Sequence, residues 1–159
     1  MKKTTDEKNI ITEIKKTTEE LLTMLKTEGK VEVGEEKSNE ESNYIIKIET
    51  QETGLLIGYH GETLNSLQLL LGVILFKKLG KWVHVVVDVG NYRQMREESI
   101  KEMVNRIVSE VEATNQGATL PYLSPLERRI VHMMLTNHGK VVSESVGEGK
   151  DRRLTIRPK

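Results

Sequence analysis

Apolar residues recur at helical spacing in two segments of the first half of the chain. Between about residues 6 and 27 they repeat every three or four positions while charged residues occupy the other positions, which predicts an amphipathic helix ended by Gly29. Residues 62–79 predict a second and more apolar helix, ended by Gly80. The apolar positions of the second helix are Leu64, Leu67, Leu71 and Leu75.

Alternating positions predict the strands around these helices. Residues 82–89 place four valines on one face of a strand, and Trp82 at its start is interpreted as a core residue. Residues 31–33 and 44–49 predict two further short strands. Residues 34–43 are rich in Glu, Ser and Asn, which predicts a mobile hairpin loop between these strands.

The second half of the chain predicts a different order of elements. A long charged helix covers residues 91–113, with an apolar stripe formed by Ile100, Val104, Ile107 and Val111. The segment Ser124-Pro125-Leu126-Glu127 has the residues of a capping box and starts a helix that continues to Asn137. Residues 118–123 are extended, and 140–146 and 153–156 form strands around a turn at 147–151.

This order predicts two α/β (α+β) units, each with a three-stranded sheet, joined by the helix at 91–113. We expect an N-terminal helix at 1–28, a first domain at 29–90 and a second domain at 91–159. A single continuous sheet through both halves would contradict this organisation.

Composition narrows the classes of function. The chain has 159 residues and no cysteine, which excludes disulfides, thiolate metal sites and a cysteine nucleophile. No apolar run approaches the roughly 18 residues of a membrane span, and no signal peptide follows Met1, so we expect a cytoplasmic protein without membrane insertion. Lys and Arg balance Asp and Glu at 24 each, but residues 101–159 carry 10 basic against 7 acidic side chains. This asymmetry is weak support for a nucleic-acid-binding face in the second half.

A glycine pair is the first candidate site. Gly58-Tyr59-His60-Gly61 stands between two predicted helical segments, where missing Cβ atoms let a phosphate approach main-chain N–H groups at a helix N-terminus. The alternative is a plain helix–helix turn. Apolar residues around the loop, Leu55, Ile57, Leu64 and Leu67, are candidates for a groove that holds bases. Replacing both glycines by Asp is expected to abolish RNA binding and to leave the fold intact.

The second candidate site is Arg128-x-x-x-His132. This spacing places both side chains on one helix face, where Arg129, Arg152, Arg153 and Arg157 can extend them into a phosphate-binding patch. The alternative is an amphipathic helix with an Arg–Glu pair and a packed histidine.

Together these strings resemble one bacterial family. The sequence from Gly54 to Leu64 and the predicted element order resemble a type II KH domain, and residues 82–98 followed by 124–132 resemble the Jag family of KH plus R-three-H proteins. The resemblance implies single-stranded RNA as the partner, a second small KH protein as a further partner, and a role in regulating cell elongation or division and the envelope. The RNA-binding residues it implies are Gly58, Tyr59, His60, Gly61, Ile57, Thr63, Leu64, Arg128, Arg129, His132, Arg152 and Arg153.

The sequence departs from the family in two respects. Many members carry Lys or Arg between the two glycines, where this chain has Tyr59 and His60, so Tyr59 is a candidate for stacking on a base and His60 for donating to a phosphate. Many members also carry an N-terminal domain and a long linker, in place of which we expect only the first helix. The alternative function is a protein-interaction adaptor that no longer binds RNA. No cofactor, metal site or catalytic constellation is indicated.

Overall fold

A computed structural model describes residues 2–38 and 41–159 and divides the chain into two compact units, Met1–Arg93 and Gln94–Lys159. Each unit holds one three-stranded sheet, which confirms the predicted fold class.

Within residues 2–38 and 41–159, none of the helices combines the length and the apolar character that crossing a bilayer needs. The elements of unit 1 are α1 (Lys2–Met24), β1 (Lys30–Ser38), β2 (Glu41–Glu49), α2 (Thr53–Ile57), η1 (Tyr59–Gly61), α3 (Glu62–Leu79) and β3 (His84–Val89). Those of unit 2 are α4 (Tyr92–Thr114), β4 (Ala118–Thr119), α5 (Pro125–Leu135), β5 (Val141–Val146), η2 (Gly149–Asp151) and β6 (Arg153–Pro158), where α4 begins two residues before the boundary.

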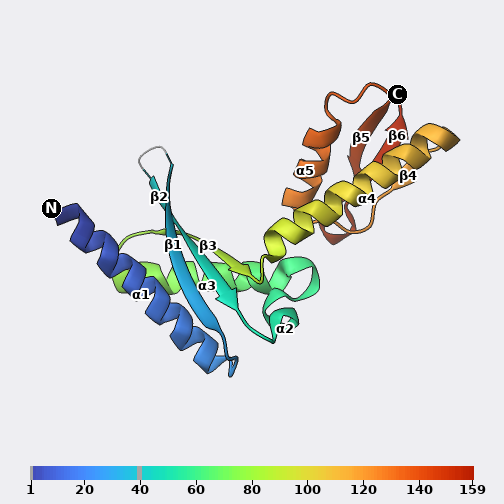
Figure 1. The fold of residues 1–159 in the computed structure, drawn as a ribbon. Coiled ribbons are helices and arrows are strands. Elements are labelled where there is room, and N and C mark those ends of the chain that lie inside the picture. Colours follow the sequence, from blue (N-terminus) through green and yellow to red (C-terminus); the bar gives the residue numbers. More distant parts are fainter. Residues whose placement is uncertain (1, 39–40) are drawn as a thin grey trace. The chain divides into compact units, whose positions relative to one another are not determined.

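Unit 1 is a sheet with helices α1 and α3 packed on one of its faces (Figure 1). The strand order is β1-β2-β3, with β2 antiparallel to β1 and parallel to β3. The alternating valines of β3 point into the same core as the apolar stripe of α3, as predicted. Lys78 near the end of α3 ties it to α1, because its Nζ lies 3.2 Å from Glu13 Oε1 and 2.9 Å from Glu20 Oε2.

The polar segment at 34–43 is the main correction to the predicted elements. Strand β1 continues to Ser38 and β2 begins at Glu41, with a register that pairs Lys30 with Glu49 and Ser38 with Glu41. Only residues 39 and 40 of the expected loop lie outside the described residues. Backbone hydrogen bonds to the partner strand hold these polar residues extended, and this ladder requires no apolar side chain.

Trp82 is the second correction. Its side chain is 63% exposed, and it precedes β3 instead of starting it. The indole stacks on Phe76 of α3 with ring centroids 4.7 Å apart. The expected core position is therefore wrong, because the strand alternation directs the neighbouring Val83, and not Trp82, into the core.

Unit 2 places α4 and α5 on one face of a sheet with the order β4-β6-β5 (Figure 1). Its core is built from aliphatic residues of both helices and all three strands or their flanks. In α4, Val108 is buried and Ile107 only partly so, because the stripe drifts around the helix. Helix α5 begins as predicted: Glu127 N–H donates to Ser124 Oγ at 3.3 Å, and Ser124 N–H donates to Glu127 Oε2 at 2.7 Å.

Candidate nucleic-acid interface

The loop between α2 and α3 has a left-handed backbone at three of its four residues. Gly58 has φ 69° and ψ −168°, His60 has φ 50°, and Gly61 has φ 82°. The conformation of Gly58 belongs almost only to glycine, and a histidine at positive φ is uncommon. This backbone turns the chain directly into α3, whose N-cap Gly61 offers no side chain to cap the first N–H groups.

At positions 58 and 61, close packing as well as the backbone angles favours glycine. A Cβ on Gly58 would lie 2.0 Å from Thr63 Oγ1, and a Cβ on Gly61 would lie 3.0 Å from Tyr92 Cε1. Both positions are thus occupied by packing within unit 1, and Asp at either would displace a neighbour and strain the backbone. The expectation that the double Asp substitution leaves the fold intact is therefore wrong.

The side chains within the loop carry no fixed positive charge. Tyr59 is 68% exposed, and its ring meets that of His60 edge-on with centroids 4.2 Å apart. Glu62, the first residue of α3, adds an exposed carboxylate beside the loop. Two backbone N–H groups at the ends of the loop are already engaged, because Gly58 donates to Gly54 O at 2.9 Å and Glu62 donates to Tyr59 O. The loop therefore offers an aromatic surface, while its own side chains contribute little to phosphate neutralisation.

The apolar groove expected around the loop is smaller than the sequence indicated. Leu64 is 0% exposed and Leu67 is 7% exposed, so both belong to the core and cannot touch a base in this structure. They lie on the inner stripe of α3, where the helical repeat directs them toward the sheet. Leu55 is 58% exposed and Ile57 is half-buried, so these two, with the exposed Thr63, are the groove candidates that remain at the surface.

In unit 2 the edge strand β5 collects part of the predicted basic patch. His132 Nδ1 lies 3.0 Å from Ser143 Oγ, and Arg152 Nε donates to Ser145 Oγ at 2.7 Å. Ser143 and Ser145 are two residues apart and share one strand face, so these anchors lie about 7 Å apart. Sequence reasoning missed both serines, although their alternation with Val142, Glu144 and Val146 is visible in the sequence. We name His132 and Arg152, together with Arg128 and Arg129 about one helical turn before His132 on α5, the β5-edge patch.

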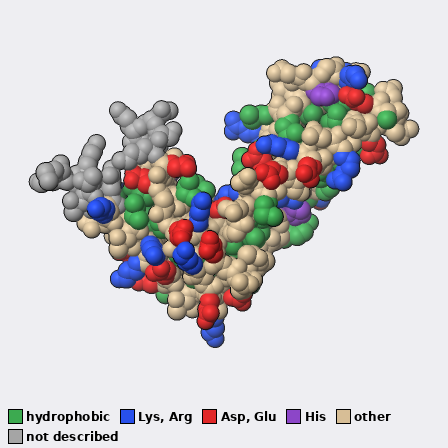
Figure 2. All heavy atoms as spheres, viewed as in Figure 1, with side chains coloured by type: hydrophobic (Ala, Val, Ile, Leu, Met, Phe, Trp, Pro, Cys, Tyr) green, Lys and Arg blue, Asp and Glu red, His purple; other side chains and the backbone are tan. Residues whose placement is uncertain are grey.

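Arg128 and Arg129 lie on the first turns of α5. Arg128 Nη1 donates to Leu123 O at 2.6 Å, which keeps this side chain half-buried near the helix start, and Arg129 is exposed. Among the described residues, neither has a carboxylate within ion-pair distance. On the face shown in Figure 2, acidic and basic side chains are interspersed, so this face does not form one large basic surface.

An internal ion pair supports the start of α5. Arg96 Nε on α4 donates to Glu127 Oε1 at 2.7 Å, with side chains 24% and 10% exposed. Burial alone raises the pKa of Glu127, but hydrogen bonds from Arg96 and from the Ser124 backbone outweigh it and leave that pKa below its ordinary value. The Arg–Glu pair expected as an alternative to an interface thus exists, but it involves Arg96 and leaves Arg129 outside it.

Arg153 does not join Arg152. Arg152 follows η2 and precedes β6, whereas Arg153 is the first residue of β6, and its guanidinium lies over the Tyr122 ring, 5.5 Å from the centroid. Arg157, two residues from Thr155 on β6, shares the face of Arg153 and pairs with Glu144 at 3.0 Å. The predicted basic cluster is therefore divided: Arg152 contacts β5 through Ser145, while Arg153 and Arg157 have partners of their own.

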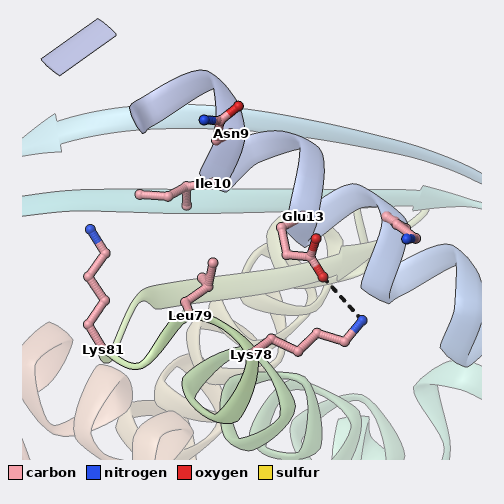
Figure 3. Close-up of a pocket in the computed structure, with 7 residues that line it drawn as sticks. Asn9, Ile10, Glu13, Lys78, Leu79 and Lys81 are labelled. Atoms are coloured by element: carbon pink, nitrogen blue, oxygen red, sulfur yellow. Dashed lines mark ion pairs between the residues drawn. The ribbon is translucent and has the colours of Figure 1, made fainter. Parts of the chain in front are cut away.

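A hollow at the other end of α3 lies outside this interface (Figure 3). Its lining includes Ile10, Glu13, Lys78, Leu79 and Lys81, and Lys78 points toward Glu13. Helix α3 has 18 residues, so the hollow lies about 27 Å from the glycine loop. The engaged Lys78 makes it a structural contact between α1 and α3.

Two family models match the chain in succession. Residues 15–87 match the KH domain of KhpA/KhpB, and residues 98–158 match the R-three-H domain. The first match contains the glycine loop and the second contains the β5-edge patch.

The curated relatives share one printed name. RNA-binding protein KhpB of Clostridium symbiosum is 33% identical over 126 residues, which cover 79% of this chain and 57% of the relative. RNA-binding protein KhpB of Bacillus subtilis (strain 168) is 32% identical over 130 residues, 80% of this chain and 62% of the relative. The chain thus spans less than two thirds of the length of these relatives. The two consecutive domain matches and these relatives show that the chain belongs to the Jag family, the KhpB-type proteins in which a KH domain precedes an R-three-H domain.

Proposed function

We propose that this chain is a noncatalytic single-stranded RNA-binding protein. The observation that carries the proposal is the Gly58–Gly61 loop, which is held in a left-handed conformation immediately before the uncapped N-terminus of α3. A helix N-terminus attracts phosphate through its N–H groups and its dipole, and KH loops of this pattern clamp about four nucleotides of backbone. Relatives named as RNA-binding proteins support the same reading.

The two interfaces have different chemistry. The N-terminus of α3, which has no side-chain cap, supplies main-chain donors, and the 68% exposed Tyr59 supplies a ring on which a base can stack. The β5-edge patch supplies fixed positive charge from Arg129 and Arg152, with His132 held beside them through Ser143. We therefore assign orientation of bases mainly to the loop and neutralisation of phosphates mainly to the patch.

The direct test replaces the two loop side chains and keeps both glycines. Tyr59→Ala removes the stacking ring, and His60→Asp adds a carboxylate at a position whose positive φ Asp tolerates better than most residues. Loss of one stacked base costs about 1–3 kcal/mol, so we expect the double variant to bind a short single-stranded RNA about 10- to 100-fold more weakly. Fluorescence anisotropy with a labelled oligonucleotide measures this affinity.

His84→Asp is the matched control. It makes the same change of charge at an exposed position of β3 that lies before the buried valines. Its RNA affinity is expected to equal that of the unmodified chain. Equal affinity for the loop variant and the control would move RNA binding away from the loop and favour the adaptor function.

In the cell we propose a post-transcriptional role in elongation, division and envelope homeostasis, exercised in the cytoplasm. The family resemblance supports this assignment. Crosslinking to cellular RNA, followed by sequencing of the bound fragments, tests it: transcripts for envelope and division proteins are expected among the fragments, and their absence would contradict the role.

A second proposed partner is another small KH protein, which we place on the outer face of α3. Leu69 is 69% exposed and Val73 is 41% exposed one turn later, and the exposed Trp82 stacks on Phe76 at the end of the same row. An apolar row of this kind on a surface helix suits a protein interface better than a nucleic-acid backbone.

Leu69→Lys together with Val73→Lys tests this partner. The double variant is expected to lose association with the second KH protein in sedimentation experiments. Retained association would place the interface elsewhere on the chain.

A further inference from the structure

The start of α4 lies against the glycine loop within unit 1. The chain leaves β3 through Gly90 and Asn91, both at positive φ, and Gly90 N–H donates to Ile48 O at 3.1 Å. Tyr92 then begins α4 and packs, half-buried, against the core of unit 1. This turn brings a residue 31 positions after Gly61 into contact with the loop.

The contact between Tyr92 and Gly61 is close. A methyl group on Gly61 would stand 3.0 Å from Tyr92 Cε1 and 3.4 Å from its hydroxyl oxygen. At the other end of the loop, the Thr63 side chain covers Gly58 in the same way. The left-handed loop is therefore supported at both glycines, and strained backbone of this kind persists only where its surroundings hold it.

Arg93 fixes the position of Tyr92. Its backbone N–H donates to Asp88 Oδ1 at 3.2 Å, its Nε donates to Val87 O at 2.7 Å, and its Nη2 donates to Gln68 Oε1 at 2.9 Å. The same Gln68 oxygen accepts from Val87 N–H at 3.0 Å. On the edge strand β3, these bonds engage the backbone N–H and C=O of Val87, and they attach the first turn of α4 to both β3 and α3.

We propose that Tyr92 is a positioning residue for RNA binding: its ring, held in place by Arg93, keeps Gly61 and the N-terminus of α3 in the orientation that presents main-chain donors to a phosphate. The inference rests on the proposed RNA binding at the loop. Tyr92 supports the loop by van der Waals packing, because its ring edge fills the space beside Gly61, which has no side chain. Loss of the ring should loosen the loop without removing any charge.

The experiment compares two substitutions at Tyr92. Tyr92→Phe keeps the ring and should bind a labelled single-stranded RNA within about twofold of the unmodified chain. Tyr92→Leu keeps apolar bulk but removes the flat ring edge, and should weaken binding about tenfold, which corresponds to one or two lost hydrogen bonds. The salt dependence of the affinity should stay unchanged, because neither substitution removes a cation.

Leu79→Ala is the matched control for a general loss of stability. Leu79 is also half-buried against the core of unit 1, but it lies at the opposite end of α3. Urea unfolding places the three variants on one stability scale, and RNA affinity is compared where all are folded. In NMR spectra, the amide signals of Gly58, Gly61 and Glu62 should shift and exchange faster in Tyr92→Leu and remain in place in Leu79→Ala.

The possible results distinguish the positioning role of Tyr92 from the proposed RNA binding on which it rests. An unmodified chain that fails to bind RNA overturns the proposed function itself. If the unmodified chain binds, equal affinity of Tyr92→Leu, or equal weakening by Leu79→Ala or Tyr92→Phe, overturns the positioning role. Should Tyr92→Leu fail to fold, Arg93→Lys decides: it keeps the charge but loses the forked contact with Gln68 and Val87, and unchanged affinity there would overturn the inference.

Discussion

The division of electrostatic work between the two interfaces gives a quantitative prediction. The loop contains no Lys or Arg, while the β5-edge patch contains Arg128, Arg129 and Arg152. For single-stranded nucleic acid, each neutralised phosphate contributes about −0.7 to the slope of log affinity against log salt concentration. Three arginine contacts therefore predict a slope of about −2.1, and Arg129→Gln with Arg152→Gln should reduce it to about −0.7.

These slopes correspond to readily measured affinities. Between about 50 and 200 mM salt the unmodified chain should lose affinity about 18-fold, and the double variant only about threefold. Anisotropy titrations with a labelled oligonucleotide at several salt concentrations measure both slopes.

Arg157→Gln is the control for this prediction. Arg157 is an exposed arginine on the same sheet, but it pairs with Glu144 at 3.0 Å and shares the face of Arg153. Its removal should leave the slope unchanged. The reasoning is refuted if Arg157→Gln reduces the slope as much as the double variant does, or if the double variant keeps the full slope while the Tyr59 and His60 substitutions flatten it.

Four further predictions concern stability. Glu127→Ala should destabilise unit 2 by about 2–3 kcal/mol, measured by amide exchange in α5, because it removes a charge-assisted bond to Arg96 and half of a capping box. The folded state lowers the pKa of Glu127, so this carboxylate stabilises unit 2 at a pH above the unfolded pKa of about 4.3. That stabilisation is lost as the pH falls through the folded pKa. Glu127→Gln should therefore reduce the pH dependence of the stability of unit 2 in that range. Leu71→Ala, at 0% exposure, should cost about 2–5 kcal/mol in urea unfolding. Trp82→Ala should cost only about 1 kcal/mol, the worth of its stack on Phe76, and a loss near the 3–5 kcal/mol of a core aromatic would contradict its exposed position.

Local signals account for what the sequence predicted well. The capping box at Ser124 and Glu127 is made by residues three positions apart, and the alternating valines of β3 report burial on one strand face. The apolar repeat of α3 was equally visible in the sequence. Leu64 belongs to this repeat, so the spacing that predicts the helix also predicts that Leu64 is buried and cannot line a groove.

Long-range pairing accounts for what the sequence could not predict. The strand at Gly34–Ser38 is extended because β2 pairs with it, and its own composition favours a loop. Arg152 and Arg153 differ by one position but contact different partners, Ser145 and the Tyr122 ring, so a count of basic residues could not place them. The contact of Tyr92 with Gly61 depends on a turn that only the folded chain contains.

The packing of the loop glycines also changes how RNA binding by this chain should be tested. An Asp at Gly58 would drive its Cβ into Thr63 and require a left-handed backbone that only glycine adopts readily, so lost binding would report lost structure as much as lost contact. Tyr59 is exposed and His60 already holds a positive φ as a non-glycine residue, so substitutions there alter the surface that RNA would meet and spare the packing beneath it. Where the glycines of a loop are required by the fold, substituting the side chains between them tests its function more cleanly than substituting the glycines. On this argument, retained affinity after Tyr59→Ala and His60→Asp would count against RNA binding at the loop more strongly than any effect of a glycine substitution could count in its favour.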